Sequence, residues 1–179
     1  MKLGFIGCGN MASAIIGGIL NKGLAQPEDI CASVKTQSSA QKIQNTLGIS
    51  CTTNNLEVAK TADYLFLAVK PQFCADVALQ IKDVLTDKQV IISVIAGKNL
   101  EWLKEHLGND KKIIRTMPNT PALVGEGVTG VCPDNLASDE ELQNVLTLLR
   151  SFGQADIVTE PILDIVGAVS GSSPAFVFM

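Results

Sequence analysis

The sequence has no run of basic residues, although it contains 14 lysines and arginines among its 179 residues. These are outnumbered by 18 aspartates and glutamates, so the formal net charge is −4 at pH 7. Proteins that bind nucleic acid neutralise successive phosphates with clustered Lys and Arg side chains. We therefore expect no nucleic-acid partner.

Metal ligands and paired cysteines are also scarce. His106 is the single histidine, and the five cysteines lie far apart without forming a C-x-x-C pair (Cys8, Cys31, Cys51, Cys74 and Cys132). Zinc sites need closely spaced Cys and His ligands, and secreted disulfide frameworks use an even number of cysteines. We expect no bound metal, reduced thiols and a cytoplasmic location.

A long uncharged segment is missing as well. Residues 1–6 are largely apolar, but glycines follow at once and no small-residue cleavage site is present. A membrane span needs about 20 apolar residues, and a signal peptide needs a cleavage site. We expect no membrane association and interpret residues 3–6 as a buried strand.

What the sequence does contain is a regular alternation of two patterns. Short β-branched apolar runs, typical of strands buried on both faces, occupy residues 3–6, 30–34, 64–69, 90–95, 113–117 and 128–132. Helical patterns lie between or after them at residues 10–22, 38–47, 72–85, 100–107 and 138–152. The alternation predicts an α/β fold of the Rossmann type, a doubly wound, mainly parallel sheet with helices on both faces.

Capping signals agree with these boundaries. Ser138 followed by Glu141 fits a capping box, and glycines follow four of the helical patterns (Gly23, Gly48, Gly108 and Gly153). The pattern changes near Pro161 to a helical run at 162–169, then a Ser-rich segment at 170–174 and an apolar end. We predict one domain over residues 1–160 and the start of a helical domain over 161–179.

A phosphate-binding turn stands directly after the first predicted strand. Residues 7–12 read Gly-Cys-Gly-Asn-Met-Ala, which is G-x-G-x-x-A. Gly7 permits the tight turn, Gly9 lets the backbone approach a pyrophosphate, and Ala12 allows the helix to pack close to the sheet. The helix N-terminus then favours the anion. Any α/β protein can collect glycine in turns, but this position within a βαβ unit favours a dinucleotide site.

The tip of the second strand indicates which dinucleotide binds. NAD-specific sites usually place an Asp or Glu there to accept a hydrogen bond from the ribose 2′-hydroxyl. This sequence has no carboxylate there, whereas Ser33, Lys35 and Thr36 can donate to a 2′-phosphate. NADPH is therefore favoured, with NADH as the alternative, although Lys35 can also be read as a solvated loop charge.

Three further segments end predicted strands: Ala68-Val69-Lys70-Pro71-Gln72, Ser93-Val94-Ile95-Ala96-Gly97 and Arg115-Thr116-Met117-Pro118-Asn119-Thr120-Pro121. Each has a structural alternative, because Lys70-Pro71 can end a strand and residues 117–121 can form a rigid turn. Together with residues 5–11 and with Ser170-Gly171-Ser172-Ser173-Pro174-Ala175, however, they resemble the pyrroline-5-carboxylate reductase family. The resemblance spans the whole chain in matching order.

This resemblance implies reduction of the cyclic imine of 1-pyrroline-5-carboxylate to L-proline by hydride transfer from NADPH or NADH, the last step of proline biosynthesis. It implies a set of residues that line the cofactor: Ile6, Gly7, Cys8, Gly9, Asn10, Met11, Ser33, Val34, Lys35, Asn55, Ala68, Val69, Lys70, Pro71, Val94, Ile95 and Ala96. It places Met117, Pro118, Asn119 and Ser170 near the substrate. Val34 stands where the family can have serine, which weakens that one assignment.

The resemblance further implies a homo-oligomer in the full-length protein, because a later helical domain of the family interlocks two subunits. That domain carries the hydroxyl group proposed as proton donor, which we expect beyond Met179. The family's S-G-S-G-P-A motif has Ser173 in place of its second glycine. We expect the chain to be a fragment of a longer protein, and to bind NADPH without useful turnover if it exists alone.

Two other interpretations remain open at this stage. A Rossmann reductase of the β-hydroxyacid dehydrogenase type shares the expected fold but does not account for the M-P-N-T-P segment. A dinucleotide-sensing module without turnover would be favoured by binding without catalysis.

Overall fold

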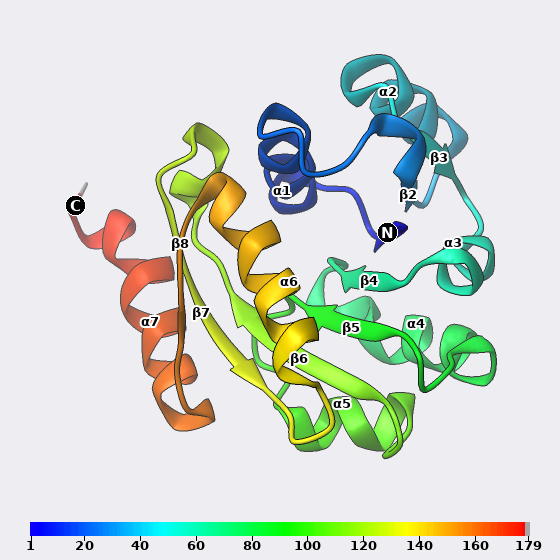
Figure 1. Ribbon diagram of the computed structural model, residues 1–179. Helices are drawn as coiled ribbons and strands as arrows, with labels where there is room; N and C mark the ends of the chain where they lie inside the picture. Colours follow the sequence, from blue (N-terminus) through cyan, green and yellow to red (C-terminus); the bar gives the residue numbers. More distant parts are fainter. Residues whose placement is uncertain (178–179) are drawn as a thin grey trace.

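The computed structural model describes the backbone of residues 1–177 and the side chains of residues 1–170. In this part of the chain an eight-stranded sheet has the order β3-β2-β1-β4-β5-β6-β7-β8 (Figure 1). All neighbouring strands are parallel except β6 and β7. The strands are β1 (Leu3–Ile6), β2 (Ile30–Ser33), β3 (Ser50–Thr52), β4 (Tyr64–Leu67), β5 (Val90–Ser93), β6 (Lys112–Met117), β7 (Gly127–Pro133) and β8 (Gly153–Ile157).

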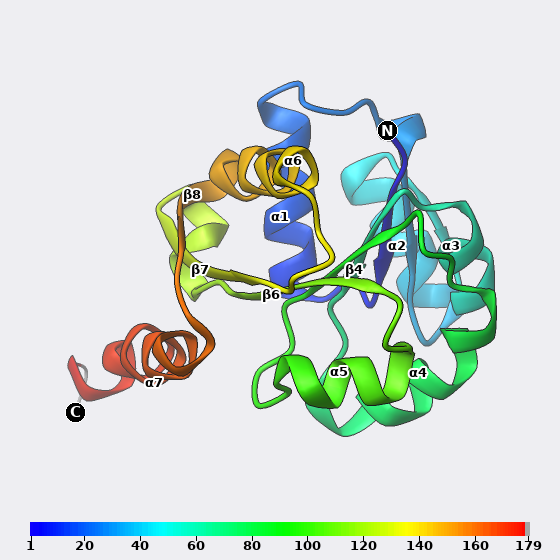
Figure 2. The same ribbon diagram turned by 60° about the horizontal axis from the view of Figure 1, so that its bottom comes forward.

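Helices cover both faces of this sheet. They are α1 (Asn10–Asn21), α2 (Gln37–Leu47), α3 (Asn55–Thr61), α4 (Cys74–Ile81), α5 (Leu100–Leu107), α6 (Asp139–Leu149) and α7 (Glu160–Val177). Short 3₁₀ turns are η1 (Pro27–Asp29), η2 (Pro71–Phe73), η3 (Lys82–Val84), η4 (Thr120–Val124) and η5 (Arg150–Phe152). Figure 2 shows α1 and α6 on one side of the sheet and α4, α5 and α7 on the other. The predicted doubly wound fold is confirmed.

Alternating side chains of the strands build two cores. Phe5 of β1 and Phe66 of β4 are paired in register and point to the α1 side, where their rings stack with centroids 4.5 Å apart. Their neighbours Leu65 and Leu67 point to the opposite side, against α3, α4 and α5. Because both faces are buried, the strands are nearly continuous apolar runs.

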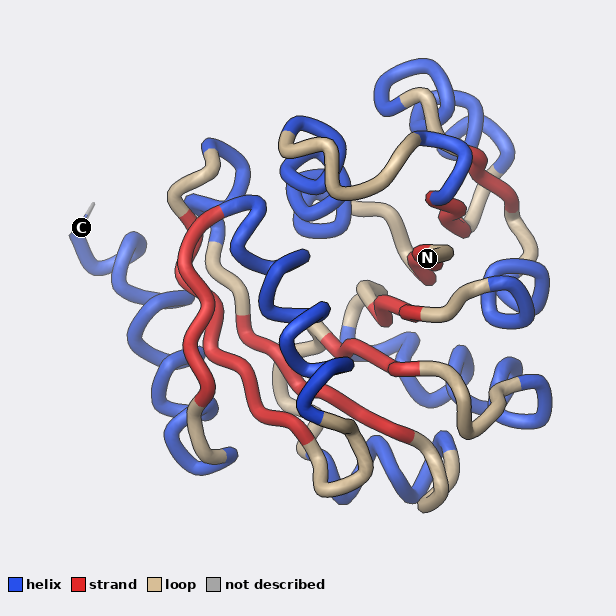
Figure 3. Tube along the Cα trace, viewed as in Figure 1, coloured by secondary structure: helices blue, strands red, loops and turns tan. Residues whose placement is uncertain are grey.

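The main differences from the sequence prediction concern short or polar elements. Strand β3 has three residues, α3 has seven, and β8 has a single buried residue, Ala155, so none of these elements was predicted. The predicted helix at 72–85 is broken into η2, α4 and η3. Figure 3 shows how much of the chain outside the long helices and strands is loop or short turn.

The predicted end of the last helix was wrong. We expected a helix at 162–169 followed by a separate Ser-rich segment, but α7 begins at Glu160 and continues through Val177. The hydroxyl of Ser170 donates to the carbonyl of Val166 one turn earlier, at 2.7 Å, so this polar side chain is satisfied inside the helix. Residues 178–179 of the predicted apolar end lie outside the described residues. Within the part that the structure describes, no helix is long and apolar enough to cross a membrane.

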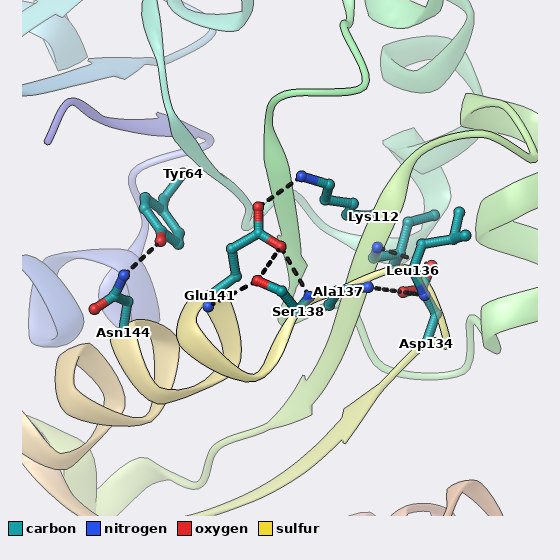
Figure 4. A network of polar contacts seen from close by, with 9 residues as sticks. Tyr64, Lys112, Asp134, Leu136, Ala137, Ser138, Glu141 and Asn144 are labelled. Atoms are coloured by element: carbon teal, nitrogen blue, oxygen red, sulfur yellow. Dashed lines mark hydrogen bonds and ion pairs between the residues drawn. The ribbon is translucent and has the colours of Figure 1, made fainter.

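The predicted capping box at the start of α6 is confirmed and extends into a larger polar network (Figure 4). Glu141 accepts hydrogen bonds from Ser138 and forms an ion pair with Lys112 of β6, with a nitrogen–oxygen distance of 2.6 Å. Burial would raise the pKa of this carboxyl group, but the bonds from Lys112 and Ser138 outweigh it and lower the pKa. One turn later, Asn144 donates to the Tyr64 hydroxyl of β4 at 2.9 Å. The network ties α6 to the sheet.

Candidate cofactor and substrate site

The turn between β1 and α1 has the geometry that a dinucleotide-binding loop requires. Gly7 has φ of +89°, and a Cβ atom there would lie 2.7 Å from the carbonyl oxygen of Ala68. Gly9 precedes α1 as its N-cap, and a Cβ atom there would meet nothing within 4 Å. Gly7 is therefore required by the fold, whereas Gly9 leaves open space beside the free N–H groups of the helix.

Cys8 between these glycines is a half-buried thiol. Burial raises its pKa, and a contact with the Ser13 hydroxyl at 3.9 Å lowers it by less. A thiol with a raised pKa is protonated and weakly nucleophilic at neutral pH. Cys8 can thus line a cofactor through its backbone without reacting.

The tip of β2 leads into a chain of side-chain hydrogen bonds. Ser33 is fully buried and its hydroxyl donates to Oδ1 of Asn55 at 2.7 Å. Asn55 in turn donates from Nδ2 to Oε1 of Gln80, on α4, at 2.8 Å. The Ser33 hydrogen is therefore already donated within the protein. The Thr36 hydroxyl caps α2 and donates to Oγ of Ser39, so the exposed Lys35 remains as the donor at this tip.

Gln80 was not predicted, and no sequence motif marks it. A second residue that sequence reasoning missed is Phe73, at the end of η2, whose ring lies 5.4 Å from Nζ of Lys35. It follows Lys70, Pro71 and Gln72 directly, so its place after β4 was the available signal. The predicted residues Ala68 and Val69 are half-buried here, and Lys70 and Pro71 are exposed.

Strand β5 ends beside β4. Val94 is half-buried and its N–H donates to the carbonyl of Leu67 at 3.1 Å, which keeps the two strand ends in register. The Ile95 side chain is buried in the core, so only its backbone can face a ligand. Ala96 is exposed. This part of the edge offers backbone and small side chains.

The end of β6 contributes the half-buried residues Met117, Pro118 and Asn119. Oδ1 of Asn119 accepts a hydrogen bond from the N–H of Val128 at 2.9 Å. This bond fixes the orientation of the side-chain amide, since only the oxygen can accept. The NH₂ group of the side chain therefore remains as its hydrogen-bond donor.

Helix α7 is fastened to the same region by a buried arginine. Arg115 of β6 is 1% exposed and pairs with Glu160 at 3.0 Å and Asp164 at 2.6 Å. Glu160 also accepts from the N–H of Leu100 at the start of α5, at 2.7 Å. Farther along α7, a Cβ atom on Gly167 would lie 3.3 Å from the Met117 side chain. The helix thus runs past Met117, and Ser170 follows one turn beyond this contact.

The sheet order brings the predicted residues to one edge. Strand β1 lies between β2 and β4, so the chain switches direction across the sheet at the β1–α1 turn, where open α/β sheets bind ligands. The carboxyl ends of β2, β1, β4, β5 and β6 meet along that edge because these strands are parallel. Among the side chains described, no three His, Cys, Asp or Glu residues are grouped to hold a metal.

Comparison with known proteins agrees with this geometry. The chain is 43% identical over 178 residues to pyrroline-5-carboxylate reductase of Escherichia coli K12, covering 99% of this chain and 66% of that protein. The chain therefore spans slightly less than two thirds of the relative's length.

Solved structures show the same likeness. A pyrroline-5-carboxylate reductase from Coxiella burnetii matches with a TM-score of 0.93 at 31% identity, over 99% of this chain and 66% of that one. The Plasmodium falciparum pyrroline carboxylate reductase with NADP bound matches with a TM-score of 0.89 at 33% identity, over 99% and 65%.

A family model described as "NADP oxidoreductase coenzyme F420-dependent" matches residues 2–97, the segment from β1 through the end of β5 that holds the dinucleotide turn. This match covers more than half of the chain. The predicted resemblance to pyrroline-5-carboxylate reductases is confirmed, and the chain belongs to the family of NADP oxidoreductases that this model describes.

Proposed function

We propose that this chain is the cofactor-binding part of a pyrroline-5-carboxylate reductase, which reduces 1-pyrroline-5-carboxylate to L-proline with NADPH. The observation that carries the proposal is the β1–α1 turn, in which Gly7 has a positive φ and Gly9 has open space where a Cβ atom would be, at the switch point of the sheet. The similarity of the whole chain to reductases of this name supports the choice of substrate.

The residues at the sheet edge fit a dinucleotide. The pyrophosphate is bound by the N-terminal N–H groups of α1, because free N–H groups and the helix dipole favour an anion. The adenosine half lies toward β2, where dinucleotide sites bind the adenosine ribose, and the nicotinamide half extends toward β5 and β6. Between these two halves lies β4, and Lys70 is an exposed cation in the loop that follows this strand.

The residues at the tip of β2 favour NADPH over NADH. Residues 33–36 contain no carboxylate to bind a ribose 2′-hydroxyl, and Lys35 and Thr36 are exposed at the β2 tip. A lysine there attracts the doubly charged 2′-phosphate of NADPH. The NADP bound to the relative from Plasmodium falciparum supports this preference.

At the reaction end, the bound nicotinamide supplies the hydride. The chain's own contribution is to orient the reactants: the amide NH₂ of Asn119 donates to an oxygen of the substrate or of the nicotinamide carboxamide. Met117 and Pro118 offer apolar surface next to it. We place Ser170 near the substrate as well, because α7 runs past Met117 toward it.

The assembly and location are proposed from the family. Helix α7 exposes Ile162 and Ile165, whose side chains are 48% and 61% accessible to solvent. We propose that the full-length protein forms a homo-oligomer in the cytoplasm, with this face of α7 covered by a second subunit. Sedimentation of the full-length protein measures its subunit number, and a monomer would contradict the assembly.

The experiment that tests the function has two stages. NADPH and NADH are titrated separately against the purified chain by calorimetry, and 1-pyrroline-5-carboxylate is then added while loss of NADPH absorbance is followed. We expect NADPH to bind more tightly than NADH. Absence of binding by either cofactor would refute the assignment of residues 7–12, and turnover would show that this chain suffices for the chemistry.

A further inference from the structure

An exposed aromatic ring lies at the expected adenosine end of the site and has no role in the proposal so far. The Phe73 side chain is 44% exposed, whereas phenylalanine is among the residue types most often buried. Nζ of Lys35 lies over this ring, 5.4 Å from its centroid. The contact joins two loops that follow β2 and β4.

Those two loops flank the dinucleotide turn. Strands β2 and β4 pair with opposite edges of β1, so Lys35 and Phe73 approach each other across the end of β1. The Ser33–Asn55–Gln80 hydrogen-bond chain, which runs from β2 to α4, holds the elements below them in place. The ring and the ammonium group therefore lie in contact, on loops next to elements that these hydrogen bonds hold together, and beside the expected adenosine position.

We propose that Phe73 is the stacking surface for the adenine ring, and that Lys35 moves from this ring to the 2′-phosphate when the cofactor binds. This inference rests on the proposed function. An aromatic face binds any purine by stacking, while an ammonium group recognises the phosphate. The cation–π contact in the free protein is weak at an exposed position, so adenine displaces Lys35 readily.

The two residues thus divide the recognition of NADPH. Phe73 recognises the base, which NADH and NADPH share, and so contributes equally to both. Lys35 recognises the 2′-phosphate, which NADPH alone carries, and so sets the preference. In the free protein the ring keeps the lysine near the site, within reach of both groups.

Fragments of the cofactor separate these roles, because 5′-AMP carries the adenine base, the ribose and the 5′-phosphate, and 2′,5′-ADP adds only the 2′-phosphate. Their dissociation constants are measured by calorimetry for the wild-type chain and for Phe73→Leu, which keeps apolar volume but removes the ring. We expect Phe73→Leu to weaken 5′-AMP and 2′,5′-ADP by a similar factor, roughly tenfold. Lys35→Met is expected to weaken 2′,5′-ADP alone, to about the affinity of 5′-AMP.

Two matched variants control the test. Phe73→Tyr retains the aromatic face and is expected to bind both fragments as the wild type does. Leu79→Ala removes an apolar side chain that is 66% exposed on the neighbouring helix α4, and should change neither affinity. Thermal melting checks that each variant is folded, which we expect because Lys35, Phe73 and Leu79 are exposed.

The possible outcomes separate the two proposals. If the wild type binds NADPH but the dissociation constants of Phe73→Leu and the wild type for 5′-AMP agree within twofold, the stacking role is refuted and the proposed function stands. A loss in Phe73→Tyr as large as in Phe73→Leu would also refute stacking. If the wild type binds neither NADPH nor either fragment, the proposed function and this inference fail together.

Discussion

Replacing Gly7 and Gly9 by alanine, one at a time, should separate folding from cofactor binding. Gly7 has φ of +89°, a conformation that costs an L-residue about 1–2 kcal/mol. Its new Cβ would also lie 2.7 Å from the carbonyl oxygen and 2.8 Å from the carbonyl carbon of Ala68. Backbone atoms cannot rotate away, so relief requires β1 and β4 to shift, at about 1–3 kcal/mol.

The sum for Gly7→Ala is about 2–5 kcal/mol of lost stability. For a chain of this length, 1 kcal/mol corresponds to roughly 2–4 °C in Tm, so we expect Tm to fall by about 5–20 °C. Gly9→Ala differs because Gly9 has φ of −87°, which alanine adopts, and its Cβ would meet nothing within 4 Å. Its cost is about 1 kcal/mol or less, the difference between glycine and alanine as an N-cap.

Gly9→Ala, which costs the fold little, should weaken NADPH binding directly. The Cβ of Gly9→Ala occupies the open space next to the α1 N-terminus, where we place the pyrophosphate, so NADPH affinity should fall tenfold or more, about 1.4 kcal/mol. Differential scanning calorimetry gives Tm and isothermal titration gives Kd for both variants. A Gly9→Ala chain that melts and binds NADPH like the wild type would refute the placement of the cofactor.

Three further substitutions test other contacts. Glu160→Ala leaves the buried Arg115 with Asp164 as its remaining ion-pair partner and should lower stability by about 1–3 kcal/mol. Asp164→Asn, at a side chain 62% exposed, should cost less than about 1 kcal/mol in urea unfolding. Glu141→Gln should cost about 1 kcal/mol at pH 7. Because the folded pKa of Glu141 is lowered, its stabilisation is fully present above the unfolded pKa of about 4.3 and is lost as pH falls through the folded pKa. The unfolding curves of variant and wild type should therefore converge as pH falls below the folded pKa. Asn119→Asp keeps an acceptor for the Val128 N–H but removes the NH₂ donor, so Tm should stay unchanged. The affinity for NADPH, or for proline with NADP⁺, should fall when measured by calorimetry. Unchanged affinity for both would leave Asn119 a purely structural role.

The sequence predicted features that depend on local geometry. The turn at Gly7 and Gly9 was recognised because its residue types follow directly from the backbone conformation, and the Ser138–Glu141 box because its partners are three residues apart. Strand β8 was missed for the opposite reason. Three of its five residues are exposed and only Ala155 is buried, and it forms because β7 offers a parallel partner along residues 127–131.

Contacts between distant segments could not be predicted in the same way. The bond from Ser33 to Asn55 spans 22 residues and that from Asn55 to Gln80 spans 25, and both depend on how α3 and α4 pack under the sheet edge. Sequence reasoning assigned Ser33 as a donor to the 2′-phosphate from its residue type alone. The structure shows its hydroxyl buried and already bonded, so its lining role stays a prediction that rests on its backbone.

The segment Arg115–Asn119 shows how one motif can serve two purposes. Sequence reasoning placed Met117, Pro118 and Asn119 near the substrate and gave Arg115 no separate role. Alternation along β6 buries Arg115 against α7, where Glu160 and Asp164 lie 45 and 49 residues away in sequence. Only Met117, Pro118 and Asn119 reach the sheet edge, where they are half-buried. The arginine therefore ties α7 to β6, whereas Asn119 is the residue that we propose as a donor to the ligand. Breaking the arginine's ion pairs should consequently loosen α7 without changing the affinity for the adenosine fragments, because we propose that these bind at the other end of the edge.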